Sequence, residues 1–367
     1  MTYKKIATFF VSVCFCLTSA IGLSSCNSSS SSNGNEIING TSDGETEKPL
    51  SENDTNLIEV IDDGDYTYAI FDKHVEVLSY LGSDTNVEIP SKYDGKPVTK
   101  LGDFSFSLTY LESVVVPSTV EEIGENCFSP LNNKPFKTDK DTYLNTLGHG
   151  AMLSIENPNY KDFTSPLKEI SLPNGLISIG AGAFSCCTAL EKINLPDSVQ
   201  AIGSAAFFNC ISLKGEIIFP KSLCEISSSA FSNCTSITKF VINSSLQELP
   251  SWLFENCTSL ESIEIPDNIS LLGQYCFAGC ISLRDLTLPS EILWVPSHCF
   301  ENCTSLEEVI LPDSICGIES SAFKGCSSLK TISIPSTIDV IERAAFEGTP
   351  WLETAPDTIN DIPIKNT

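Results

Sequence analysis

Seven cysteines recur at nearly constant spacing, and thiols are the side chains of this sequence most suited to chemistry. Two thiols can form a disulfide, several can bind zinc, and an activated thiolate can act as a nucleophile. The chain holds 16 cysteines in all. The recurring ones are Cys187, Cys210, Cys234, Cys257, Cys280, Cys303 and Cys326.

Zinc binding and catalysis have little support elsewhere in the sequence. There is no Cys-x-x-Cys pair, and the three histidines (His74, His149 and His298) are scattered. We therefore expect no metal site and no cofactor. No histidine lies in a context that suggests a nucleophile–base arrangement, and the acidic residues are spread through variable positions. We expect no catalytic residues and no enzymatic activity.

A column of aspartates offers one further ligand type. Asp197, Asp267 and Asp313 each follow a proline at the end of a short apolar segment. Aspartate commonly caps turns at such Pro-Asp steps, which is the interpretation we favour. Calcium binding is the alternative.

The cysteines belong to an internal repeat with a period of 23 residues, interrupted by a single interval of 24. Phe106 and Phe128 precede the regular series in the same phase. A fixed period of this size is typical of a leucine-rich-repeat solenoid, in which stacked copies bury one another's apolar side chains. The regular phenylalanines are Phe184, Phe207, Phe231, Phe254, Phe277, Phe300, Phe323 and Phe346.

One copy shows how a unit should fold. Val309 and Leu311 are two residues apart, as on the inward face of a strand, and the proline that follows ends the strand. Ile315 and Ile318 should point inward from a second short segment. The ring of Phe323 then fills the middle of the coil.

The columns together read C-x-x-L-x-x-I-x-L-P-x-x-[VI]-x-x-I-x-x-x-A-F, and this pattern resembles the BspA-like, or Treponema pallidum-type, leucine-rich repeats. The resemblance covers about residues 100–350. It implies a mostly β, right-handed repeat solenoid of about ten rungs of 23 residues each. It also implies a bacterial surface adhesin or host-interaction protein, because several family members bind extracellular-matrix components.

Both ends of the chain depart from the repeat. Residues 57–100 are similar to the strand-rich entry segment of family members, so we expect a β-rich N-terminal cap before a solenoid over 101–350. Trp351 can cover the last core, which indicates a C-terminal cap and tail over 351–367. An insertion at about 129–165 interrupts the phase.

The N-terminus indicates export. A basic head and an apolar run over 6–22 fit a secretory signal over 1–25. The LSSC sequence ending at Cys26 resembles a lipobox, which implies that the Cys26 thiol carries a lipid. The alternative is ordinary cleavage near Ala20, with Cys26 incidental. Residues 26–56 are polar and should form a flexible tether. We expect a protein lipid-anchored in the bacterial cell envelope, at the outer-membrane surface.

Repeat geometry argues against disulfides in the main cysteine column. Equivalent residues on stacked strands lie about 4.7–4.9 Å apart with parallel Cβ directions, whereas a bridge needs converging Cβ atoms about 3.8 Å apart. We predict a ladder of buried thiols that pack as small apolar groups. Cys276 and Cys299 remain the one candidate pair. In Cys186-Cys187 we expect one exposed and one buried thiol.

The residue before each recurring cysteine is Asn or Gly, with Cys186 as the exception. Asn and Gly are the two residues that best tolerate positive φ. We therefore predict a left-handed turn in this column that leads into the next strand.

The composition limits the partners. There are 47 acidic and 21 basic residues, giving a net charge of −26, and such a surface repels phosphate backbones. We expect no nucleic acid, contact with a membrane only through the N-terminal lipid, and protein partners, including extracellular matrix or another cell surface. The sequence does not predict the oligomeric state.

Binding residues should lie where the repeat varies. One outward position in each first strand is variable, and in the insertion Phe136, Tyr143 and Tyr160 could contact a partner. We predict a non-catalytic adhesin or protein-binding scaffold for host matrix or other cells. The alternatives are a polysaccharide-binding or a purely structural envelope lipoprotein. The outward residues are Ser171, Asn194, Ile218, Val241, Glu264, Thr287, Ile310 and Ser333.

Overall fold

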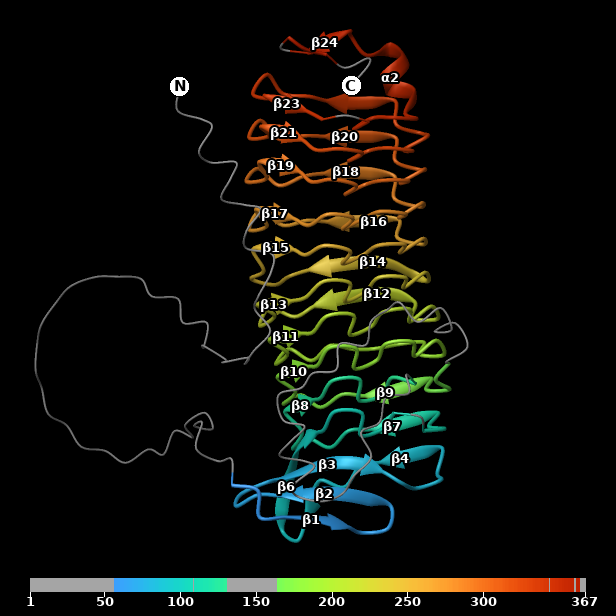
Figure 1. Ribbon diagram of the computed structural model, residues 1–367, viewed down its shortest axis with the longest axis vertical. Helices are drawn as coiled ribbons and strands as arrows, with labels where there is room; N and C mark the ends of the chain where they lie inside the picture. Colours follow the sequence, from blue (N-terminus) through green and yellow to red (C-terminus); the bar gives the residue numbers. More distant parts are fainter. Residues whose placement is uncertain (1–55, 108, 131–163, 343, 360, 364–367) are drawn as a thin grey trace, which may run out of the picture.

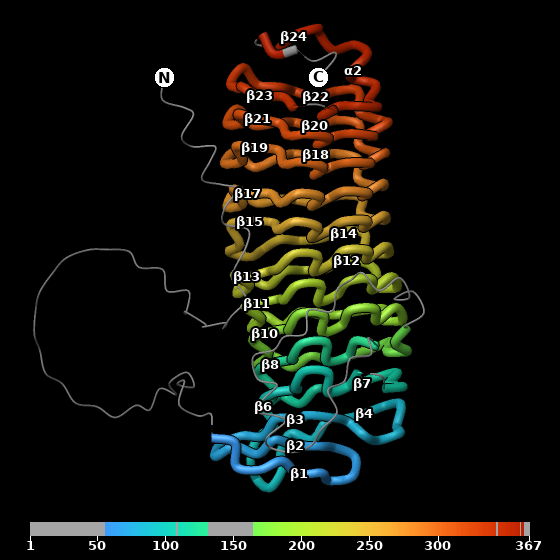
Figure 2. The backbone as a smooth tube through the Cα atoms, in the orientation of Figure 1, coloured from blue at the N-terminus to red at the C-terminus, as the bar shows by residue number. Residues whose placement is uncertain are grey.

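The structure is a computed structural model that describes residues 56–107, 109–130, 164–342, 344–359 and 361–363. They form a stack of about ten rungs, each rung being one turn of the chain (Figure 1). Outside the residues drawn in grey, the backbone trace follows one coil from the N-terminal strands to the C-terminal helix (Figure 2). The prediction of a mostly β solenoid is confirmed.

Each rung begins with a short first strand, and these strands form one column along the stack (Figure 1). Their inward residues are buried, as for Val309 and Ile332, which lie opposite each other in a parallel pair. The first strands are β4 (Asn86–Glu88), β7 (Ser113–Val115), β9 (Glu169–Ser171), β12 (Gly215–Phe219), β14 (Ile237–Ile242), β16 (Ser262–Glu264), β18 (Asp285–Thr287), β20 (Glu308–Ile310) and β22 (Thr331–Ser333).

A second strand, two residues long in all but the first of these rungs, follows and forms the other column. These strands also pair in parallel, so that Ile179 lies opposite Ile202 and Ile202 opposite Ile226. The second strands are β6 (Lys96–Leu101), β8 (Glu122–Ile123), β10 (Ser178–Ile179), β11 (Ala201–Ile202), β13 (Glu225–Ile226), β15 (Glu248–Leu249), β17 (Leu271–Leu272), β19 (Trp294–Val295), β21 (Gly317–Ile318) and β23 (Val340–Ile341).

The N-terminal end is built from longer, antiparallel strands. β1 (Glu59–Asp62) pairs with β2 (Tyr66–Ile70), and β2 pairs with β3 (Val75–Tyr80). β3 then pairs in parallel with β6, and β5 (Lys92–Tyr93) pairs antiparallel with β6. The antiparallel sheet therefore continues directly into the column of second strands.

A short helix lies over the last rung. α2 (Pro350–Thr354) begins after Thr349, whose side chain accepts a hydrogen bond from the Leu352 N–H. The buried Trp351 ring lies 4.6 Å from the Phe346 ring, so it covers the end of the core. The antiparallel pair β24 (Thr358–Ile359) and β25 (Ile362–Pro363) follows.

A ladder of phenylalanine rings runs through the middle of the stack. Phe184 and Phe207 lie 5.1 Å apart at an interplanar angle of 5°, and Phe323 and Phe346 lie 5.5 Å apart at 1°. Phe240 contacts the rings on either side of it in the middle of the ladder. It lies 5.3 Å from Phe231 and 4.3 Å from Phe254.

An irregularity in strand pairing coincides with the single 24-residue interval. The register between β12 and β14 shifts between Gly215 and Glu216, and Gly215 has a φ of 86°. Glycine adopts this conformation without a steric cost, so the extra residue leaves the core untouched.

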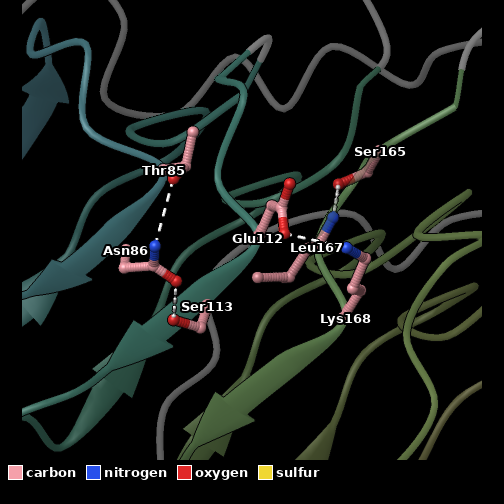
Figure 3. A network of polar contacts seen from close by, with 7 residues as sticks. All are labelled: Thr85, Asn86, Glu112, Ser113, Ser165, Leu167 and Lys168. Carbon is pink, nitrogen blue, oxygen red and sulfur yellow. Dashed lines mark hydrogen bonds and ion pairs between the residues drawn. The ribbon is translucent and has the colours of Figure 1, made fainter.

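The rungs on either side of the insertion are direct neighbours. β7 pairs with β9, and the Phe128 and Phe184 rings lie 5.2 Å apart at 7°. Figure 3 shows the polar contacts at this junction, where Lys168 Nζ lies 2.8 Å from a Glu112 carboxylate oxygen. Residues 131–163 lie outside the described residues, and with them Phe136, Tyr143 and Tyr160.

Candidate functional site

The seven recurring cysteines are all buried, and each thiol has a hydrogen-bond partner. Every Sγ lies 3.0–3.4 Å from the carbonyl oxygen of the ladder phenylalanine in the rung before it. Six of these seven carbonyls, all except that of Phe128, also accept the backbone N–H of the cysteine in their own rung. The Phe254 carbonyl, for example, accepts the Cys257 N–H and the Cys280 thiol. The sequence did not predict this link between rungs.

Burial makes these thiols poor nucleophiles. Desolvation raises the pKa of Cys187, Cys234, Cys280 and Cys326 to about 12. The thiolate is the reactive form, so almost none is present at neutral pH. Each cysteine among the described residues is a free thiol.

The burial and the backbone conformation of Cys186 both differ from what the sequence predicted. Cys186 is buried, like Cys187, so the predicted exposed thiol in this pair is wrong. The Asn209 Nδ2 atom lies 3.8 Å from its Sγ and helps to enclose it. Cys186 also has a φ of 59°, close to the 58° of Asn209, so the predicted left-handed turn is present here as well. Inter-rung contacts impose this conformation even where the residue is neither Asn nor Gly.

The predicted outward column lies on the first strands, and we call this surface the first-strand face. Seven of its eight residues are exposed, and Val241 is half-buried. Neighbours are in register, with Ile218 opposite Val241 and Thr287 opposite Ile310. Ile218 is 50% exposed and Ile310 is 48% exposed. Exposed aliphatic side chains therefore recur on a sheet face that faces solvent.

A charge-balanced stripe lies immediately before the first strands. The residues alternate in sign from one rung to the next, with Thr238 as the one neutral position. Two of the pairs have nitrogen–oxygen distances of 2.7 and 2.8 Å, and these exposed pairs each contribute at most about 1 kcal/mol. The charged residues are Glu112, Lys168, Glu191, Lys214, Glu261, Arg284, Glu307 and Lys330.

A family model described as "BspA type Leucine rich repeat region (6 copies)" matches residues 79–157, 132–261 and 247–364. These matches together cover well over half of the chain. The chain belongs to the BspA-type leucine-rich-repeat family.

Several solved bacterial leucine-rich-repeat proteins are similar to this BspA-type chain. The Treponema pallidum protein TpLRR is 27% identical, with 61% of this chain and 90% of that one covered and a TM-score of 0.48. A leucine-rich cell surface protein from Faecalibacterium prausnitzii is 25% identical, with 79% of this chain and 92% of that one covered and a TM-score of 0.37. The pneumococcal vaccine antigen PcpA is 20% identical, with 81% of each chain covered and a TM-score of 0.47. No curated protein matches the chain.

The BspA-type stack contains a second column of positive φ that sequence reasoning missed. It follows the second strands and holds bulky residues such as Trp252, Tyr275 and His298, with φ of 58–59°. Backbone bonds between rungs hold it, including Trp252 N–H to the Gln274 carbonyl at 3.0 Å. Asn or Gly is rare in this column, so composition gave no signal. The recurrence of three ring residues every 23 positions could have revealed the column.

The described part of this BspA-type protein offers no metal site or membrane span. No group of three or more His, Cys, Asp or Glu side chains within it could hold a metal ion. In the same ranges, no helix has the length and apolar character needed to cross a membrane. Cys26 lies outside the described residues.

Proposed function

We propose that this protein is a non-catalytic cell-surface adhesin that binds other proteins, in host matrix or on other cells, through the first-strand face. The observation that carries the proposal is the pair of exposed isoleucines, Ile218 and Ile310, in a solvent-facing column. Fully burying an exposed isoleucine contributes about 1.5–3 kcal/mol, and because each of these is already half buried, a partner would add about half of that at each position. Repeat proteins use extended surfaces of this kind for binding.

The charge-balanced stripe supports the same surface. The protein carries a net charge of −26, so most of its surface repels an acidic partner. Alternating signs beside the first strands cancel at distances beyond the spacing of the rungs. An acidic partner can therefore approach this surface more easily than the rest of the molecule.

We propose that a lipid on Cys26 anchors the protein at the outer-membrane surface, with residues 26–56 as the tether. Protease added to intact cells should release the chain while a cytoplasmic marker stays whole. The Cys26→Ala variant, which cannot carry the lipid, should be released into the medium. If the wild-type chain resists the protease on intact cells and is cut only after the cells are lysed, it is not exposed at the surface.

The binding test uses residues 27–367 against a panel of matrix proteins and glycans. At least one protein should bind without being turned over. The variant Ile218→Thr/Ile310→Thr should bind it at least about tenfold more weakly, the equivalent of about 1.4 kcal/mol. Threonine keeps the β-propensity of isoleucine, so the fold should not change. Binding to glycans alone would favour the polysaccharide-binding alternative.

Deletion of residues 129–165 tests the insertion. Because the rungs of Phe128 and Phe184 already contact each other, a short Gly-Ser linker should leave the stack folded. Weaker protein binding would assign a contact role to Phe136, Tyr143 and Tyr160. If neither this deletion nor the isoleucine variant changes binding or cell adhesion, the purely structural alternative is favoured.

A further inference from the structure

A second exposed surface lies away from the first-strand face. We call it the second-strand flank and define it as residues 248–256, 271–279 and 294–302. It carries Leu271 at 58% exposure, Trp294 at 43% and Trp252 at 39%. The preceding rung has the small or acidic residues Glu225 and Ser229 at the corresponding positions. Two of the chain's three tryptophans thus lie exposed within three neighbouring rungs.

The ring residues of the flank occupy a conformation that bulky side chains rarely adopt. Trp252, Tyr275 and His298 all have positive φ, whereas the rungs on either side have Ser229 and Ser321 in this column. The rings of Trp252 and Tyr275 lie 5.8 Å apart at 9°, and those of Tyr275 and His298 lie 4.4 Å apart at 4°. Because serine suffices in the same fold, the stack does not require these rings. Trp252 is exposed and the other two rings are half-buried, and bulky rings kept at a strained backbone position where serine suffices point to function.

Trp294 packs over a glycine in the next rung. Its indole atoms Cζ3, Cε3 and Cη2 occupy the space that a Cβ at Gly317 would need. Gly317 lies opposite Trp294 in the β19–β21 pair and has no positive φ, so close approach of the indole is the feature that requires glycine there. This packing limits the freedom of the indole before a partner binds, which lowers the entropy cost of binding.

The flank also carries carboxylates. Glu248 is exposed beside Leu271 in the β15–β17 pair, and Glu301 lies 2.8 Å from His298 Nδ1. The flank contains no Lys or Arg, in contrast to the balanced stripe beside the first strands. Aromatic rings and carboxylates together suit a guanidinium or ammonium group, through cation–π contacts and charge-assisted hydrogen bonds. The net charge of −26 also attracts a cation over a distance, whereas a neutral glycan gains nothing from it.

We propose that the second-strand flank is a docking surface for a cationic, arginine-rich segment of another protein. Arginine fits better than lysine because its planar guanidinium both stacks on rings and binds carboxylates in a bidentate manner. This proposal does not rest on the first-strand face as a binding site. The proposal for either surface can be disproved without affecting the other.

The test titrates a labelled oligo-arginine peptide into residues 27–367 at low and at physiological salt. Trp294→Ala, at an exposed position, should fold normally and bind at least about tenfold more weakly. Gly317→Ala should weaken binding similarly, because it displaces the indole without removing it. Ile218→Thr/Ile310→Thr is the matched control on the other face and should bind like the wild type.

Two results would overturn the proposal. One is equal peptide affinity in the wild type and in both Trp294→Ala and Trp252→Ala/Tyr275→Ala, with affinity set by salt alone, which would mean only general attraction to an acidic protein. The other is a neutral oligosaccharide whose binding depends on Trp294 while peptide binding does not, which would identify a glycan site.

Discussion

The Cys257 thiol lies 3.3 Å from the carbonyl oxygen of Phe231, one rung before it in the stack. The backbone N–H of Cys234 donates to the same oxygen from within the rung of Phe231, also at 3.3 Å. The repeated cysteine is therefore a small buried side chain that also donates a hydrogen bond between rungs. Alanine could fill part of the space but could not donate.

Replacing Cys257 separates these two roles. Cys257→Ala should lower the free energy of unfolding by about 1–2 kcal/mol, through the lost hydrogen bond and a small cavity. Cys257→Ser keeps a donor and should be at least as stable as Cys257→Ala. Urea denaturation midpoints measure both. If the thiol acted only as an apolar filler, serine would be the more damaging substitution, because it buries a hydroxyl group.

The raised thiol pKa values predict instability in alkali. The pKa of Cys234 and of Cys280 is about 12 in the fold, against an ordinary 9.0. Below about pH 9 both folded and unfolded thiols are protonated, so they contribute no pH dependence. Above it the unfolded state loses protons that the folded state keeps, so stability should fall by about 1.4 kcal/mol per pH unit for each such thiol.

Urea midpoints measured from pH 8 to about pH 11 check this slope. Cys234→Ala/Cys280→Ala is the control, and its stability should fall less steeply over the same window, because two titrating groups are gone. Parallel curves for this variant and the wild type would show that the buried thiols do not cause the alkaline loss.

Gly325 should tolerate alanine less well than Gly215 does. Both have positive φ, of 73° and 86°, so alanine costs about 1 kcal/mol at either site. At Gly325 the Asn302 Oδ1 atom also occupies the space for a Cβ, whereas the space at Gly215 is open. Overpacking should add at least about 1 kcal/mol to Gly325→Ala. Equal denaturation midpoints for the two variants would contradict this account.

The sequence could predict those features of the fold that are the same in every rung. Ile315, Ile318 and Phe323 are all fully buried, as their phase predicted. A residue that points inward in one rung must do so in every rung, because parallel pairing keeps the register. The outward residues Ile218 and Ile310 could be placed for the same reason.

The features that sequence reasoning missed depend on contacts rather than on residue preference. The Cys186 turn and the Trp252 column are held by hydrogen bonds between rungs, such as Cys186 N–H to the Phe208 carbonyl at 2.7 Å. The contact of Trp294 with Gly317 joins residues 23 positions apart whose types alone do not indicate it. The thiol bonds likewise need the positions of two rungs at once.

The most direct test of the account compares two variants with two probes. The variants are Ile218→Thr/Ile310→Thr on the first-strand face and Leu271→Thr/Trp294→Ala on the second-strand flank, and the probes are a matrix protein that binds the wild type and the oligo-arginine peptide. Equilibrium titration should show the isoleucine variant losing at least about tenfold in affinity for the matrix protein alone, and the flank variant losing as much for the peptide alone. If the isoleucine variant, with an unchanged melting temperature, binds the matrix protein as tightly as the wild type, the first-strand face is not the binding surface.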